Sequence, residues 1–306
     1  MLIDDAHRYV MLRRALGFKL EKTARHLDAF TRHAVANGDS HVRTATALAW
    51  TAAVSSTPGA RYRRLQEIAD FARFMHAEDA AHEIPQHRRY YRPGVRPAPY
   101  IYTPDELARM LDAATNLRRQ KPSPLRRHVH ATLIGLLAAT GLRVSEALNL
   151  RLGDLLPNGV LHIRQTKFNK SRLVPMHASV VAALDGYLRV RATVASVDDH
   201  MFLTVGGRRM GLGTVHAAFH VILNKAGIAP DRPRRPRIHD LRHTFATRAL
   251  AQCAMRRDDV ARDFVALSTY LGHGHIRHTY WYLEATPDLM GDIATAAEML
   301  AAEVIA

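Results

Sequence analysis

The segment Ala139-Thr140-Gly141-Leu142-Arg143-Val144-Ser145-Glu146-Ala147-Leu148 lies near the middle of the chain. Apolar residues flank one arginine and one glutamate, Arg143 and Glu146, three positions apart. Residues at this spacing are neighbours on a helix. A surface ion pair at a helix start is one interpretation of the pair. A functional site is the other.

The segment lies between a predicted helix and a predicted β-hairpin. An apolar stretch over 127–139 indicates a helix that ends near Gly141. Alternating residues over 160–166 and 172–176 indicate two antiparallel strands, joined by the basic tip Lys167-Phe168-Asn169-Lys170. A lysine on such a turn suits charge contact with a phosphate ester or proton delivery to it. An ordinary solvated turn is the alternative.

The chain changes character at residues 83–102. Residues 1–82 have the periodicity of about four basic helices, which indicates a small helical module. The next stretch contains four prolines and four arginines, and we expect an extended linker: Pro85, Pro93, Pro97, Pro99, Arg88, Arg89, Arg92 and Arg96. These arginines suit a strap across a phosphate backbone, or else a solvated linker. Thr103-Pro104-Asp105-Glu106 then has the residues of a helix start, so a second domain begins there.

The composition points to a polyanionic partner. The 306 residues include 43 Lys plus Arg against 28 Asp plus Glu, a net charge of +15, and binding of a polyanion by such a surface releases counterions. The single cysteine, Cys253, excludes a disulfide framework and a cysteine zinc cage. The most apolar stretch, 131–142, is shorter than the roughly 20 residues of a membrane span. With no signal-peptide layout at the start, we expect a cytoplasmic protein.

A third cluster is His239-Asp240-Leu241-Arg242-His243. We expect His239 and Arg242 to share a helical face, with an acid/base group beside a phosphate clamp. A zinc site is the alternative, because His243 is four residues from His239. The two-histidine pattern of zinc proteases needs Glu after the first histidine, where this chain has Asp240, so zinc is disfavoured.

A fourth cluster follows at Leu271-Gly272-His273-Gly274 and ends in Tyr280-Trp281-Tyr282. The two glycines allow a sharp bend around His273. A tyrosine hydroxyl has a pKa of about 10 and reacts as a nucleophile only beside a base or in a cationic pocket. Core or interface packing is the alternative for the aromatic run.

Taken in order, these clusters resemble the tyrosine recombinase (phage integrase) family. The matching motifs are Thr-Gly-Leu-Arg-x-Ser-Glu, the Thr-Lys hairpin, His-x-Leu-Arg-His, Leu-Gly-His and a tyrosine nine residues beyond His273. The resemblance covers about 103–285 closely, and the N-terminal module is similar in kind to the family's core-binding domain. It implies a catalytic set and a supporting residue: Arg143, Lys167, His239, Arg242, His273 and Tyr282, supported by Glu146.

The resemblance also implies the role of each residue. Tyr282 would attack the scissile phosphodiester and form a 3′-phosphotyrosine, and the spacing from His273 favours it over Tyr280. Arg143 and Arg242 would clamp the phosphate, and His273 would donate another hydrogen bond to it. The remaining roles are acid/base exchange with the tyrosine for His239, protonation of the leaving 5′-oxygen for Lys167, and support of the arginines for Glu146. No metal or cofactor is implied.

The implied fold is mainly α with a small antiparallel β-sheet. It comprises a SAM-like helical core-binding domain (1–82), the linker (83–102), a catalytic domain (103–287) and a C-terminal helix (288–306). That last helix would dock on a neighbouring protomer or else pack within its own chain. DNA contacts are expected from the hairpin and the linker, at Lys170, Arg172, Arg88, Arg89 and Arg92.

The implied function is site-specific recombination of double-stranded DNA, with a mobile element preferred as the setting. A homotetramer on paired sites is expected, with accessory recombinases as further partners. A type IB topoisomerase would share the chemistry but would relax DNA as a monomer. A catalytically silent DNA-binding protein is disfavoured, because every member of the catalytic set is present.

Overall fold

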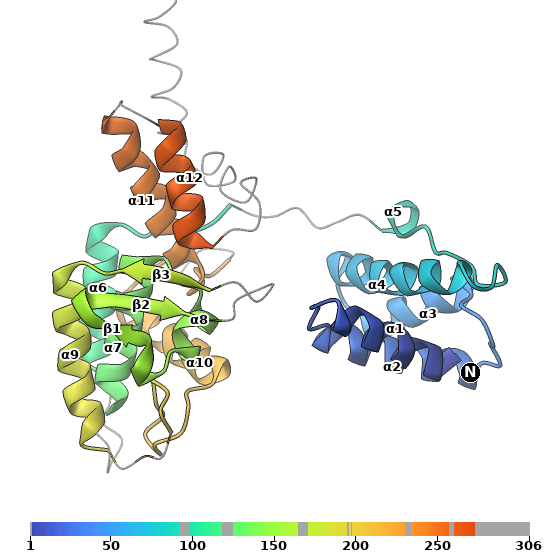
Figure 1. Cartoon of the computed structure of the whole chain (residues 1–306), viewed down its shortest axis with the longest axis horizontal. Helices are drawn as coiled ribbons and strands as arrows, with labels where there is room; N and C mark the ends of the chain where they lie inside the picture. Colours follow the sequence, from blue (N-terminus) through green and yellow to red (C-terminus); the bar gives the residue numbers. More distant parts are fainter. Residues whose placement is uncertain are drawn as a thin grey trace, which may run out of the picture. The chain divides into compact units, whose positions relative to one another are not determined.

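The structure, a computed structural model, describes residues 2–91, 98–117, 125–164, 171–194, 196, 198–229, 234–256 and 260–272. The chain divides into two compact units, Met1–Pro97 and Ala98–Ala306 (Figure 1). The boundary falls inside the linker predicted over 83–102. That stretch includes one helical turn, α5 (His87–Tyr90), where we expected an extended chain. The turn forms between Pro85 and Pro93, where every residue retains its backbone N–H donor.

The described part of the first unit is helical, as the periodicity predicted. Its longer helices are α1 (Leu2–Ala15), α2 (Glu21–Ala36), α3 (Thr44–Val54) and α4 (Pro58–His76). Their apolar faces enclose one core, in which the rings of Phe30 and Trp50 meet edge to face at 5.7 Å. Tyr9 of α1 packs against Phe71 of α4. All the described residues of this core lie within Met1–Pro97.

The second unit combines helices with a three-stranded sheet, and the prediction of a mainly α fold with a small antiparallel sheet is confirmed. Its helices are α6 (Pro104–Thr115), α7 (Leu125–Thr140), α8 (Val144–Asn149), α9 (Ala178–Ala192), α10 (Leu212–Lys225), α11 (Asp240–Arg256) and α12 (Val260–Leu271). Its strands are β1 (Leu155–Leu156), β2 (Val160–Ile163) and β3 (Arg172–Pro175), with 3-10 turns η1 (Leu152–Asp154) and η2 (Pro157–Gly159) beside β1.

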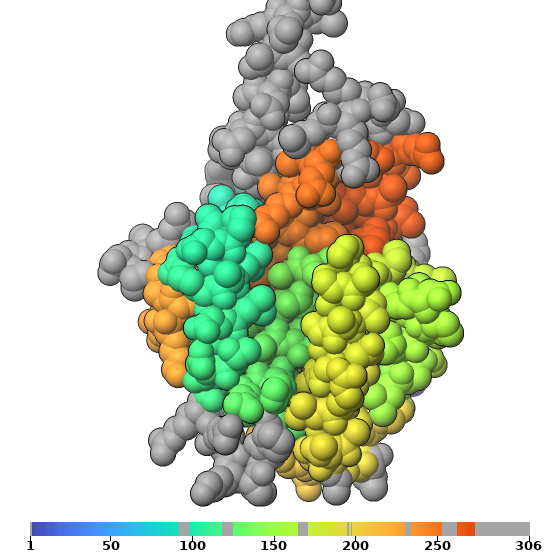
Figure 2. All heavy atoms as spheres, turned by 90° about the vertical axis from the view of Figure 1, so that its left-hand side faces the viewer, coloured from blue at the N-terminus to red at the C-terminus, as the bar shows by residue number. Residues whose placement is uncertain are grey.

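Helix α7 is central to the second unit and packs against α6, α9 and α11. Figure 2 shows α6, α7 and α9 side by side along one face, with α11 at one end. Helices α11 and α12 share a smaller apolar cluster that includes Ala246, Leu250 and Leu271. Among the described residues, no helix is both long enough and apolar enough to cross a membrane.

The sheet confirms the two strands predicted around the basic tip. β2 pairs antiparallel with β3, with Ile163 opposite Arg172 and Leu161 opposite Val174. The short strand β1, which we did not predict, pairs with the other edge of β2. β3 also contacts α12, so one strand of the hairpin is packed against the helix that leads to residue 273.

The predicted start of the second domain forms as a capped helix. Glu106 N–H donates to Thr103 Oγ1 at 3.1 Å, and Thr103 N–H donates to Glu106 Oε2 at 2.8 Å. This reciprocal capping satisfies two backbone donors at the first turn of α6. Upstream of it, Tyr102 is buried, and its hydroxyl donates to the Arg237 carbonyl at 3.1 Å. The chain entering α6 is thereby held against the segment that leads to α11.

Candidate active site

Three arginine side chains and one glutamate meet at the C-terminal end of α12. Arg143 precedes α8, Glu146 lies in its first turn, Arg172 begins β3, and Arg242 lies in the first turn of α11. The arginines donate to three successive carbonyls: Arg172 to residue 270 at 2.7 Å, Arg242 to residue 271 at 2.7 Å and Arg143 to residue 272 at 3.4 Å. Cations are favoured at a helix C-terminus, where carbonyls lack helical partners.

Glu146 holds two of these arginines together. Its side chain is 6% exposed, and each of its oxygens accepts two hydrogen bonds. Oε1 accepts from Arg143 Nη1 at 2.7 Å and Arg172 Nη1 at 3.1 Å, while Oε2 accepts from Arg143 N–H at 3.0 Å and Arg172 Nη2 at 2.8 Å. Burial would raise the pKa of Glu146, but Arg172 and then Arg143 outweigh it and lower the pKa to about 2. The carboxylate is therefore ionised.

Arg143 lies directly before α8, with the extended backbone angles of a capping position (φ −69°, ψ 141°). Its contact with Glu146 is therefore made from outside the helix, whereas the spacing alone predicted two positions within it. Its side chain is 32% exposed, so the guanidinium is both oriented and accessible. This combination suits recognition of an anion.

Arg242 is 2% exposed and connects two backbone segments. Its Nη1 donates to the Gly141 carbonyl and its Nη2 to the Leu271 carbonyl, both at 2.7 Å. Gly141 has a φ of +60°, and a Cβ there would lie 2.5 Å from the Phe245 ring. The close approach of the α7–α8 turn to α11 therefore depends on glycine.

His239 precedes α11, which begins at Asp240, so it lies at the helix start and outside the first turn. Its ring meets that of His243 edge to face at 4.9 Å. Burial and then the charge of Arg242 lower the pKa of His239 to about 4, which makes the ring neutral at pH 7. A neutral imidazole can accept a proton. The buried Asp240 accepts from Arg237 N–H and Nη2, each at 2.8 Å.

Some predicted site residues lie outside the described residues: Lys167, Lys170, His273, Tyr280, Tyr282, Arg92 and the segment 288–306. Those that the structure describes as coming together are Arg143, Glu146, Arg172 and Arg242, with His239 at the start of the helix that carries Arg242. Arg88 and Arg89 are exposed on α5 in the other unit.

The position of Arg172 differs from that of an open DNA contact. Its side chain is 12% exposed, and its Nε, Nη1 and Nη2 each donate within the protein. Strand alternation would have indicated this, because Arg172 and Val174 share a face of β3 and Val174 is fully buried. Leu173, between them, is exposed. Because Val174 is buried, strand alternation predicts that the side chain of Arg172 also faces the protein interior.

Two groups of potential metal ligands occur in the described residues, and neither includes a residue of this site: His41, Asp79 and His82, and Asp198, Asp199 and His200. In the first group, His82 Nδ1 accepts the Val42 N–H at 3.1 Å. In the second, Asp198 accepts from His200 N–H and from Arg209 N–H. In each group, one side chain thus accepts a hydrogen bond from the backbone of a loop.

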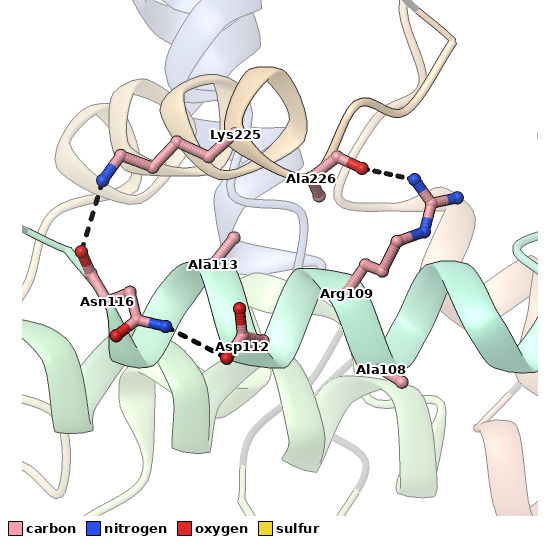
Figure 3. A pocket seen from close by; sticks show the side chains of 7 residues that line it. All are labelled: Ala108, Arg109, Asp112, Ala113, Asn116, Lys225 and Ala226. Carbon is pink, nitrogen blue, oxygen red and sulfur yellow. Dashed lines mark hydrogen bonds between the residues drawn. The ribbon is translucent and has the colours of Figure 1, made fainter.

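A surface hollow between α6 and the end of α10 is also separate from the site (Figure 3). Its polar groups bond to one another: Arg109 donates to the Ala226 carbonyl, and Lys225 donates to the Asn116 carbonyl at 3.2 Å. These bonds tie α6 to α10. None of the candidate catalytic residues lines this hollow.

The sequence is similar to a protein family and to several known proteins. Residues 101–288 match the Phage integrase family. The "Putative integrase/recombinase y4rB" of Sinorhizobium fredii is 40% identical over 291 residues, which are 92% of this chain and 92% of the relative. The "Tyrosine recombinase XerD" of Bifidobacterium longum is 28% identical over 236 residues, covering 74% of this chain and 72% of that protein.

Solved structures share the fold. An integrase of the Tn1549 transposon, solved with transposon right end DNA, has a TM-score of 0.69 at 19% identity and covers 98% of this chain and 99% of its own. A lambda integrase dimer bound to a core site has a TM-score of 0.63 at 18% identity and covers 92% and 76%. At these identities the likeness is one of fold.

Proposed function

Because this chain belongs to the phage integrase family and is a tyrosine-type site-specific recombinase, we propose that it cuts and rejoins double-stranded DNA through Tyr282. The Tyr282 oxygen attacks the scissile phosphorus, the bond from phosphorus to the 5′-oxygen breaks, and a 3′-phosphotyrosine and a free 5′-hydroxyl result. Rejoining reverses these steps with the 5′-hydroxyl of another strand. The phosphoester bond energy is conserved in the protein–DNA link.

The observation that carries this proposal is the convergence of Arg143 and Arg242 on the backbone of residues 271–272, immediately before His273. In the proposed reaction, Arg143 and Arg242 bind the non-bridging phosphate oxygens and stabilise the charge that develops on them. Glu146 balances Arg172 and orients Arg143. His273 donates a further hydrogen bond to the phosphate.

Two proton transfers complete each cleavage. His239 takes the Tyr282 proton, and Lys167 delivers a proton to the departing 5′-oxygen. With a pKa of about 4, the His239 ring is unprotonated at neutral pH and has a nitrogen lone pair available for the proton. Lys167 lies in the sequence between β2 and β3, and β3 contacts α12.

We propose that the reaction needs no metal or cofactor, because Arg143, Arg242 and Lys167 supply the positive charge at the phosphate. Cleavage is therefore expected to proceed at an unchanged rate in excess EDTA. A rate that falls on chelation and returns with Mg²⁺ would contradict this part of the mechanism.

The proposed setting is integration or excision of a mobile element in the cytoplasm. The fold likeness to a transposon integrase and the relative named as an integrase/recombinase support the setting. A homotetramer on paired sites would perform the exchange, with the segment 288–306 docking on a neighbouring protomer and accessory recombinases as further partners.

The test captures covalent protein–DNA adducts. The protein is incubated with fragmented host DNA that includes the flanks of its own gene, then denatured, and the attached fragments are sequenced. Tyr282→Phe and Tyr280→Phe are run in parallel. Loss of adducts only with Tyr282→Phe is expected, whereas loss only with Tyr280→Phe would overturn the assignment.

Plasmids that carry the captured site separate recombination from topoisomerase activity. Products joined between paired sites are expected from a recombinase. Relaxation of a supercoiled plasmid with one site, without joined products from paired sites, would instead indicate a type IB topoisomerase-like activity.

A further inference from the structure

Arg172 occupies a junction of three segments of the site. Its Nε donates to the Tyr270 carbonyl at 2.7 Å, and its Nη1 and Nη2 grip both oxygens of Glu146 at 3.1 and 2.8 Å. Such a two-pronged pair fixes direction as well as distance. One planar group thus joins the first residue of β3, the first turn of α8 and the last turn of α12.

The end of α12 is also shaped to receive this guanidinium. Gly272 has a φ of +67°, and a Cβ there would lie 2.9 Å from Arg172 Nη1 and 3.1 Å from its Cζ. Any larger residue would displace the guanidinium or the helix end. The backbone that enters His273 therefore lies directly against Arg172.

Arg172 and Arg143 both bind Glu146 but differ in their exposure and in the other acceptors that they use. Arg172 is 12% exposed, and each of its side-chain nitrogens donates a hydrogen bond to Glu146 or to the Tyr270 carbonyl. Arg143 shares the same carboxylate but is 32% exposed. Because Arg172 already opposes the charge of Glu146, Arg143 can bind a phosphate without leaving a buried carboxylate unpaired.

We infer that Arg172 is a positioning residue for DNA cleavage. It fixes the position of Arg143 relative to the end of α12 and makes no contact with DNA itself. The inference rests on the proposed function, since it assigns Arg143 and His273 to the phosphate. Arg172 also follows Lys170 by two residues in the sequence and is the first residue of β3, so it joins this strand to the same assembly.

The inference is tested with single-turnover cleavage of a nicked duplex that carries the captured site. Arg172→Gln and Arg172→Lys are compared with the wild type at saturating DNA. Both are expected to lower the cleavage rate constant by about 100-fold, the cost of about 1 Å of misplacement. Lysine is not expected to rescue the rate, because one ammonium cannot bind both Glu146 oxygens and the Tyr270 carbonyl together.

DNA affinity distinguishes positioning from direct contact. The Kd and its salt dependence are expected to stay within twofold of the wild type in both variants. A phosphate contact would instead weaken binding, lower the salt slope by about one and be largely retained by lysine. That outcome would overturn the inference and leave the proposed function standing.

Two controls complete the experiment. Arg164, at the opposite base of the hairpin, is 54% exposed and pairs with Asp154, so Arg164→Gln is expected to cleave at the wild-type rate. A purely structural role for Arg172 would lower the fraction of active protein and leave the rate constant of that fraction unchanged, which would also overturn the inference. A wild-type chain that forms no adduct would overturn the proposed function and this inference together.

Discussion

Glu146 is a buried carboxylate whose charge is opposed by two guanidinium groups. Replacement by glutamine keeps the shape but leaves Arg143 and Arg172 without a counter-charge, and breaking a buried pair costs about 3–5 kcal/mol. We expect Glu146→Gln to lower the free energy of unfolding by that amount at pH 7, measured by urea denaturation. Glu78→Gln is the matched control, because Glu78 pairs with Arg8 at the surface and solvent screens that pair.

The difference in unfolding free energy between the wild type and Glu146→Gln is expected to depend on pH. The folded pKa of Glu146 is about 2, below its ordinary value of 4.5, so its ionised form stabilises the fold above about pH 4.5. This contribution is lost as the pH falls from about 4.5 toward 2. The difference between wild type and Glu146→Gln is therefore expected to shrink over that range. A difference that stays constant down to pH 2 would show that the carboxylate is not ionised in the folded protein.

The pKa of His239 predicts the pH at which the activity declines on the acid side of its profile. Burial and then Arg242 lower its pKa from 6.5 to about 4, so the neutral ring persists well below neutral pH. If His239 is the base, kcat/KM stays level as the pH falls from 8 to 5 and declines near 4. An NMR titration of the His239 ring, assigned with His239→Gln, measures the same pKa. A midpoint near 6.5 in the free protein would contradict the prediction.

The turn between α7 and α8 is the element that brings Arg242 to its place. Gly141 supplies the carbonyl that Arg242 binds, has a positive φ and lies against Phe245. We expect Gly141→Ala to destabilise the second unit by about 2–4 kcal/mol, from backbone strain and overpacking together. Gly153→Ala is the control, because nothing lies within 4 Å of a Cβ there. Equal unfolding midpoints for the two variants would contradict the close packing at Gly141.

Helix periodicity and cap chemistry predicted the elements well, because both are local. The Thr103–Glu106 cap and the strands of the hairpin formed where their residue patterns indicated. Strand β1 was missed because its two residues, Leu155 and Leu156, are too few to show alternation. It pairs with β2, with Leu155 opposite Leu161 and Leu156 opposite Val160.

The site was predicted less completely, because its geometry depends on contacts between distant segments. The motif order indicated Arg143 and Arg242, but nothing local shows that both bind the end of α12, 129 and 29 residues further along the chain. The inward direction of Arg172 follows from strand alternation only once Val174 is known to be buried. Periodicity shows which face of an element is apolar and leaves open what that face meets.

The described residues of the two compact units form separate buried clusters. The four residues that come together at the candidate active site, Arg143, Glu146, Arg172 and Arg242, all belong to the second unit. The first unit contributes basic surface, including Arg88 and Arg89 on α5. If the first unit binds DNA through this surface, we expect DNA affinity and cleavage rate to be changed by different substitutions.

The salt dependence of DNA binding tests the contribution of α5. With a net charge of +15, the chain is expected to bind duplex DNA with an affinity that falls steeply as salt rises. If Arg88 and Arg89 contact phosphates, the double change to glutamine lowers the slope of log K against log salt by about two. The cleavage rate constant at saturating DNA should not change, because no hydrogen bond among the described residues joins either of them to Arg143, Glu146, Arg172 or Arg242.

The matched control removes the same amount of charge from the same unit. Arg32 and Arg73 are exposed, but each pairs with an aspartate of its own helix, Asp28 and Asp70. Replacing both with glutamine lowers the net charge by two and is expected to leave the salt slope close to that of the wild type. An equal loss of slope in the two double variants would mean that total charge sets the affinity. A loss confined to Arg88 and Arg89 would assign α5 to the DNA backbone.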